Sequence, residues 1–90
     1  MEKAHADIIS LEEFRTQMRT KMDEGRAKYG PIWAGKDPLS ESLDECLDIA
    51  NYSMEASRIG MISPSEAQFV VRLMFGLFNH ISRLLLSAAS

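Results

Sequence analysis

The chain has 90 residues, a net charge of −3 at pH 7 and a pI near 5.3. Its acidic balance argues against a surface that binds a nucleic acid polymer through phosphate contacts. Hydrophobic residues make up 46% and charged residues 26%, which is typical of a globular and not a disordered protein. A chain this short is expected to form one domain over residues 1–90. Because so small a domain buries only about 60% of its unfolded surface, its stability is marginal unless it associates.

The first predicted helix covers residues 11–29. Ser10 and Glu13 match the capping box, in which the Ser side chain accepts from the third backbone N–H of the helix. Gly30 can adopt the left-handed conformation that ends a helix, and Pro31 prevents its continuation. The apolar residues recur at helical spacing on one stripe: Leu11, Phe14, Met18 and Met22.

A short connection follows, with two glycines, one proline and the only tryptophan. Trp33 in this loop could stack on a nucleobase, or it could fold back over an exposed edge of the core. Lys28, Arg26 and Lys36 flank the loop and could contact phosphates. They could equally be ordinary solvated side chains.

The second predicted helix covers residues 38–59, because Asp37 is a favoured N-cap and Pro38 suits the first helical position. Gly60 is its expected C-terminal cap. One stripe of this helix is apolar and comprises Leu43, Cys46, Leu47, Ala50 and Met54. The opposite stripe comprises Glu41, Glu45, Asp48, Tyr52 and Glu55, with Asp44 and Asn51 at its margin.

The acidic stripe of residues 38–59 is unusual because it contains no lysine. Like charges three or four residues apart repel each other, so Glu41, Asp44, Glu45 and Asp48 together favour a bound cation. The alternative is a solvated face on an acidic protein. Glu41 is near a helix N-terminus, where the macrodipole stabilises a negative charge, but Asp48 lies about three turns in and has no such support.

The chain has a single cysteine, so it cannot form an internal disulfide. Cys46 lies on the apolar stripe of residues 38–59. We therefore expect a buried, unreactive thiol in a reducing compartment.

The third predicted helix covers residues 64–87 and opens with Ser63 as cap and Pro64 at its first position. Its apolar side chains occupy most of the circumference: Phe69, Val70, Val71, Leu73, Met74, Phe75, Leu77, Phe78, Ile81, Leu84, Leu85 and Leu86. Such a helix must be buried nearly all round, which indicates a subunit interface, most simply that of a twofold dimer. Changing Phe75 or Phe78 to Glu is expected to break that dimer. His80 is interpreted as a packing or interface residue, with metal ligation as the alternative.

The N-terminus has no basic segment leading into an apolar core, so a secretory signal is not expected. The most apolar run is interrupted by Asn79, His80 and Arg83 and is shorter than the roughly 20 residues of a bilayer span. These features predict a cytoplasmic protein that does not associate with membranes.

Four features of residues 26–52 together resemble the MazG-like all-α nucleoside triphosphate pyrophosphohydrolases. They are Lys28-Tyr29-Gly30, then Trp33, the Asp37-Pro38-Leu39 helix start, and the phrase DECLDIANY that contains Glu45, Asp48 and Tyr52. The resemblance implies an all-α fold in which three helices form a bundle completed by dimerisation. It also implies hydrolysis of a nucleoside triphosphate, ribo or deoxyribo, to the monophosphate and pyrophosphate.

The same resemblance implies roles for individual residues. Glu45 and Asp48 would bind Mg²⁺, or Mn²⁺ in its place, and Glu41 would be a third ligand or the base that orients water. The phosphates would be bound by Lys28, Lys36 and Arg58. Trp33 or Tyr52 would contact the base.

One part of the family pattern is missing. The upstream E-E-x-x-E group has no clear counterpart, since Glu12-Glu13 and Asp23-Glu24 do not reproduce it. Four interpretations are open: Glu41 with Asp44 substitutes for it, a neighbouring subunit completes the site, the protein binds nucleotide without hydrolysing it, or the site has decayed. The rival interpretation of the whole chain is a non-catalytic helical module for oligomerisation or protein interaction.

Overall fold

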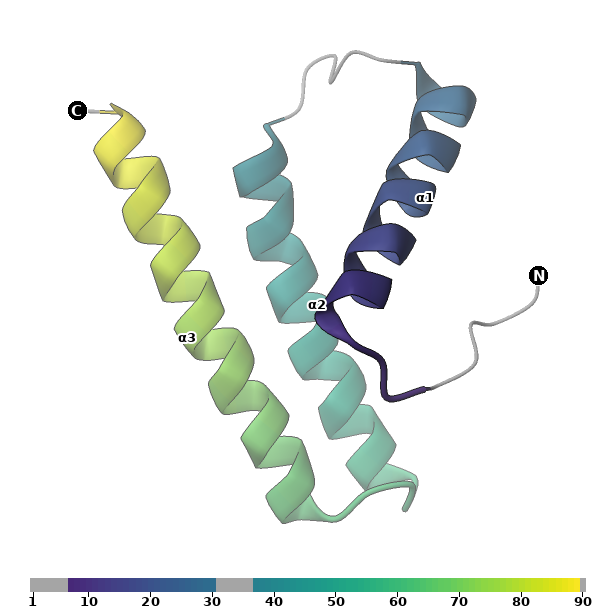
Figure 1. Cartoon of the computed structure of the whole chain (residues 1–90). Helices are drawn as coiled ribbons and strands as arrows, with labels where there is room; N and C mark the ends of the chain where they lie inside the picture. Colours follow the sequence, from purple (N-terminus) through teal and green to yellow (C-terminus); the bar gives the residue numbers. More distant parts are fainter. Residues whose placement is uncertain (1–6, 31–36, 90) are drawn as a thin grey trace. The chain divides into compact units, whose positions relative to one another are not determined.

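The protein is all-α, as expected. The computed structural model describes residues 7–30 and 37–89, and within these ranges it contains three helices and no strand. The helices are α1 (Leu11–Tyr29), α2 (Pro38–Arg58) and α3 (Pro64–Ala89) (Figure 1). The three predicted starts are confirmed, α2 ends one residue earlier than predicted and α3 continues two residues further.

The chain divides into two compact units, Met1–Ile32 and Trp33–Ser90. α1 belongs to the first unit, while α2 and α3 form the second. The expectation of a single domain over the whole chain stays a prediction.

Capping residues explain where α1 begins and where it ends. The Ser10 hydroxyl oxygen accepts from the Glu13 backbone N–H at 3.1 Å, which confirms that half of the capping box. At the other end Gly30 has φ 88°, and its N–H donates to the Arg26 carbonyl at 2.9 Å. The apolar stripe of α1 stays more than half exposed at each of its four positions: Leu11, Phe14, Met18 and Met22.

α2 and α3 form a helical hairpin, in which they lie side by side and run in opposite directions (Figure 1). Asp37 caps α2 by accepting from the Leu39 N–H at 3.1 Å and from the Ser40 hydroxyl at 2.8 Å. The turn after α2 is a Schellman motif, since the Met61 N–H donates to the Ala56 carbonyl and the Gly60 N–H to that of Ser57. Gly60 has φ 84°, as its predicted capping role requires.

The hairpin is held by a seam of side chains at alternating spacings of three and four residues. Its buried members are Cys46 and Ser53 on α2 with Ala67 and Ile81 on α3. Half-buried residues continue the two rows: Leu39, Leu43, Ala50 and Ser57 on α2, and Val71, Met74, Phe78 and Leu85 on α3. This is the spacing of a coiled-coil seam. Three of the four buried side chains, those of Cys46, Ser53 and Ala67, are small, which permits a close approach of the two backbones.

The seam corrects two expectations about α2. Cys46 is buried as predicted, with 3% of its surface exposed. Leu47 and Met54 were expected on the same buried stripe but are 52% and 45% exposed. Ser53 is buried in their place, because the row that faces α3 is rotated toward it. The Ser53 hydroxyl donates to the Ala50 carbonyl at 2.8 Å, so its burial leaves no donor unsatisfied.

The apolar segment of α3 is also longer than expected. Among the described residues, the segment Pro64–Ala88 is long and apolar enough to cross a bilayer by length and composition. We had expected its apolar run to be too short. This property alone is weak evidence of a membrane span, because core helices of soluble proteins share it. Only 6% of its most apolar window is buried among the described residues.

Candidate metal and nucleotide site

The acidic side chains of α2 lie on the face opposite the seam. With a rotation of about 100° per residue, Asp44 and Asp48 point away from the row that contains Cys46 and Ser53. Glu41 is half-buried, whereas Asp44, Glu45 and Asp48 are exposed. Packing of the hairpin therefore leaves this face available to solutes.

These four carboxylates have no cationic partner in the part of the chain that the structure describes. None of them makes a hydrogen bond or an ion pair there. Glu41 and Glu45 are one turn apart, as are Asp44 and Asp48, so the repulsion expected from the sequence is present and uncompensated.

Glu55 behaves differently from the other acids of α2. The Arg58 Nε donates to Glu55 Oε2 at 2.8 Å, and Arg58 Nη2 donates to Oε1, so the pair is bidentate. The hydrogen bonds from the guanidinium lower the pKa of the Glu55 carboxyl, and the same contact raises the pKa of Arg58. Arg58 was predicted to bind phosphate, yet two of its donors are already bound to Glu55.

The described residues of one chain do not bring a full metal site together. No group of three or more His, Cys, Asp or Glu side chains in residues 7–30 and 37–89 is placed to hold a metal ion. The predicted ligands Glu41, Glu45 and Asp48 share one helix face but do not converge on one point. Any metal bound there would take its remaining ligands from water, from a substrate or from another chain.

The predicted nucleotide contacts are distributed over both units. Tyr52 is on α2 and is 72% exposed, so its ring is available for stacking. Lys28 is exposed near the end of α1 in the first unit. Trp33 and Lys36 lie outside the described residues, so their predicted roles stay predictions. His80 is exposed on α3.

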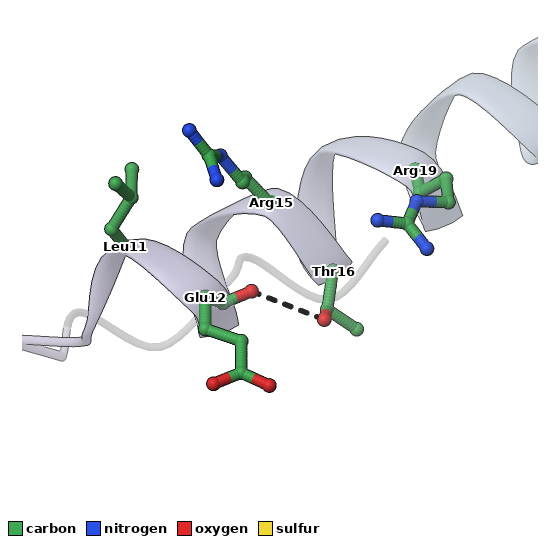
Figure 2. Close-up of a pocket in the computed structure, with 5 residues that line it drawn as sticks. All are labelled: Leu11, Glu12, Arg15, Thr16 and Arg19. Carbon is green, nitrogen blue, oxygen red and sulfur yellow. Dashed lines mark hydrogen bonds between the residues drawn. The ribbon is translucent and has the colours of Figure 1, made fainter.

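A surface hollow on α1 was not anticipated from the sequence. It is lined by Leu11, Glu12, Arg15, Thr16 and Arg19 (Figure 2). The Thr16 hydroxyl donates to the Glu12 carbonyl at 3.2 Å, which keeps that side chain against its own helix. In Figure 2 the Glu12 carboxylate and the Arg15 guanidinium point in different directions.

Comparison with known proteins identifies no relative of this chain. No protein-family model, curated protein sequence or solved structure matches the chain.

Proposed function

We propose that the protein is a Mg²⁺-dependent hydrolase that converts a nucleoside triphosphate to its monophosphate and pyrophosphate. One observation supports this most directly. The solvent-facing side of α2 carries four carboxylates that have no ion pair or hydrogen bond among the described residues. A cation that binds there would relieve their repulsion.

The donor chemistry of this face fits Mg²⁺. Mg²⁺ is usually bound through one or two carboxylates and keeps several waters, with substrate phosphate oxygens completing its octahedron. Glu45 and Asp48, one turn apart on α2, are the pair that would hold it. When bound, the ion would supply neutralisation of charge on the phosphates and on the departing pyrophosphate.

Side chains of the protein would accept the proton of the attacking water and bind the nucleotide. The reaction adds water across the bond between the α- and β-phosphates, and the proton that leaves the water needs an acceptor. Glu41 is one turn before Glu45 on the same helix and is the candidate base. Tyr52 is exposed one turn after Asp48 and is a candidate contact for the base of the nucleotide.

Of the three proposed phosphate contacts, Arg58 already has a partner in the structure, and this distinguishes it from Lys28 and Lys36. Arg58 would have to leave Glu55 or use its free donor positions, because its Nε and Nη2 already donate to that carboxylate. Lys28 and Lys36 precede α2 in sequence and remain proposals for the substrate phosphates.

The test is pyrophosphate release from a panel of ribo- and deoxyribonucleoside triphosphates in the presence of Mg²⁺. We expect release by the wild type and a loss on the order of 100-fold in Asp48→Asn, because removal of an outer-shell partner already costs about 10- to 100-fold and this variant removes the charge of a proposed ligand itself. Glu55→Gln is the matched control, because it also removes one carboxylate from α2 but one that is paired with Arg58.

Two results would contradict the proposal. The first is a folded wild type that releases no pyrophosphate from any member of the panel. The second is equal loss in Asp48→Asn and Glu55→Gln, which would assign the effect to charge or folding and not to a ligand of the metal.

A second candidate function is a non-catalytic interaction module. It is favoured by the apolar stripe of α1, which is more than half exposed at Leu11, Phe14, Met18 and Met22. In that case the acidic face of α2 would be a solvated surface or a binding site for a basic partner, and nucleotide would have no effect on the protein.

A further inference from the structure

The contact with Glu55 orients the guanidinium of Arg58 on α2. Arg58 Nε donates to Glu55 Oε2 at 2.8 Å and Arg58 Nη2 donates to Oε1, so the carboxylate occupies one side of the planar group. A guanidinium has five N–H donors in a rigid fork, and this contact uses one on Nε and one on Nη2. The remaining donors on Nη1 and Nη2 include two that are parallel and point away from Glu55. Arg58 therefore presents two neighbouring donors in a defined direction.

The guanidinium lies closer to Tyr52 than the position of Arg58 in the sequence suggests. Its contact with Glu55 brings it back toward the start of α2, to about the level of the Glu55 carboxylate. Tyr52 is about 4.5 Å before Glu55 along the helix axis, and Asp48 is about 6 Å before Tyr52. Spacings of four and three residues keep these groups on one face of the helix. Because all of them belong to α2, their order along this face is determined by one helix.

This order matches the order of the parts of a nucleotide. In the proposed function, Mg²⁺ at Glu45 and Asp48 holds the phosphates, and the ring of Tyr52 contacts the base. The sugar lies between phosphate and base, and one turn of helix, about 5.4 Å, leaves room for it between Asp48 and Tyr52. A base stacked on Tyr52 has an edge that faces the next turn of α2. The guanidinium of Arg58 lies at that turn.

The phosphates are a less favourable ligand for Arg58 than the base. The backbone of Arg58 is about 15 Å beyond that of Asp48 along the helix axis. Contact with phosphates held at Asp48 would therefore require Arg58 to leave Glu55, whereas contact with a base on Tyr52 requires no such change. This geometry differs from the sequence-based prediction, in which Arg58 binds phosphate.

Guanine is the base that suits two parallel donors best. Its O6 and N7 atoms are neighbours on one edge and both accept hydrogen bonds, and their bidentate contact with arginine is the commonest specific contact between a side chain and a base. Adenine has an amino group in place of O6, so one donor of Arg58 would face another donor. Thymine presents a single acceptor on the corresponding edge, and cytosine presents an amino group.

We propose that Arg58 binds O6 and N7 of a guanine base and that the preferred substrate is a guanine nucleoside triphosphate. The proposal rests on the proposed function for the location of the phosphates and adds the identity of the base. Glu55 does not touch the nucleotide and is a positioning residue that holds the guanidinium. Glu55→Gln should therefore lose part of the guanine preference and keep pyrophosphate release from the other nucleotides of the panel.

The first test measures binding without turnover. Triphosphates with a methylene group between the α- and β-phosphorus atoms resist cleavage there, so isothermal titration calorimetry with Mg²⁺ gives their Kd values. We expect the wild type to bind the guanosine analogue on the order of 10-fold more tightly than the adenosine analogue. Arg58→Gln should remove this difference. Arg83→Gln is the matched control, because it removes the same charge from α3 and should keep the difference.

Two further nucleotides identify the edge of the base that Arg58 contacts. Inosine triphosphate keeps O6 and N7 but lacks the amino group of guanine, so its kcat/KM should equal that of GTP. The analogue of GTP in which carbon replaces N7 lacks one acceptor, and its kcat/KM should fall by about 5-fold. Arg58→Lys keeps the charge but not the planar fork, so it should treat GTP and this analogue alike. A loss with inosine triphosphate would assign recognition to the amino group and overturn the proposal.

The outcomes separate this inference from the proposed function. A guanine preference that disappears in Arg58→Gln and persists in Arg83→Gln supports the inference. Pyrophosphate release with no guanine preference, or with a preference that is unchanged in Arg58→Gln, overturns the inference and leaves the proposed function intact. Binding that prefers guanine with no pyrophosphate release contradicts the hydrolase and retains the role of Arg58. Absence of binding to both uncleavable analogues overturns the inference.

Discussion

The side chains that decide how α2 meets α3 are small. Ala67 has no exposed surface, and Cys46 and Ser53 are buried on the side of α2 that faces α3, so these positions permit a close approach of the two helices. Large apolar residues such as Leu47 and Phe75 are left outside the seam. For this hairpin, the direction in which a side chain points relative to the other helix determines its burial more than its hydrophobicity.

The charged side chains of α2 also differ from one residue to the next. Glu55 and Arg58 neutralise each other, whereas Glu41, Asp44, Glu45 and Asp48 have no such contact among the described residues. An i,i+3 spacing to a basic residue at the helix end explains this difference. The candidate site is therefore the segment of α2 before Tyr52, where no arginine or lysine is in reach on the same helix.

The Glu55–Arg58 pair predicts a pH effect. The hydrogen bonds from Arg58 lower the Glu55 pKa from its usual value of 4.5. Stabilisation by the pair is therefore present above pH 4.5 and is lost as the pH falls through the lowered pKa of the folded state. A carbon-detected NMR titration of the Glu55 carboxyl should give a midpoint below 4.5 in wild type.

Arg58→Gln is the control for that titration. It removes the guanidinium but keeps a side chain of similar length, so the Glu55 midpoint should return toward its usual value. A midpoint that does not change in Arg58→Gln would show that the pair does not persist in solution, as is common for exposed ion pairs.

At the scale of elements, capping residues close to each helix end determine where the helices begin and end. Ser10, Asp37 and Ser63 accept backbone hydrogen bonds at the starts of the three helices at 3.1 Å each. Gly30 and Gly60 have positive φ at the ends of α1 and α2. These interactions involve residues within a few positions of one another, so the sequence alone specifies them.

Two glycines provide a matched test of this conclusion. Gly60 has φ 84°, a conformation that side chains with a Cβ rarely adopt, while Gly76 is inside α3 with ordinary helical geometry. A Cβ at either position meets no atom within 4 Å, so only the backbone distinguishes them. Gly60→Ala should destabilise by about 1 kcal/mol, and Gly76→Ala should stabilise by up to about 1 kcal/mol.

Thermal unfolding would measure both variants. For a domain of this size, 1 kcal/mol corresponds to about 4–8 °C in Tm. A Gly60→Ala variant as stable as wild type would mean that the turn between α2 and α3 does not need a left-handed residue. That result would contradict the hairpin geometry described above.

At the scale of the whole molecule, the described part of one chain leaves both its apolar surface and its candidate metal site incomplete. Large apolar side chains of α3 such as Leu73 and Leu77 are exposed, and no three potential ligands converge on one point in residues 7–30 and 37–89. Substrate oxygens and water, or a neighbouring chain, would complete the metal site.

Metal binding can be measured without turnover by thermal unfolding with and without millimolar Mg²⁺ or Mn²⁺. A ligand that binds only the folded state stabilises by RT ln(1 + [L]/Kd), or about 2.7 kcal/mol at a hundredfold excess over Kd. We expect a rise in Tm that is reversed by a chelator. Asp48→Asn should abolish the rise, and Glu55→Gln should retain it.

Loss of the metal-dependent rise in both variants would indicate general screening of the acidic face and not a site. A rise in Tm that survives in Asp48→Asn would place the ion elsewhere on the chain. Either result would remove Asp48 from the candidate ligands while leaving the hairpin unchanged.

The sequence by itself determined the all-α class, the three helix starts, the two glycine caps, the burial of Cys46 and the clustering of acids on α2. Each of these depends on residues close together in the chain, through capping, backbone conformation or helical period. Only the tertiary structure decided that Ser53 and not Met54 faces α3 and that Phe78 is in the seam. Burial is decided by partner surfaces, and a helical period gives the width of an apolar stripe but not the direction from which another helix will cover it.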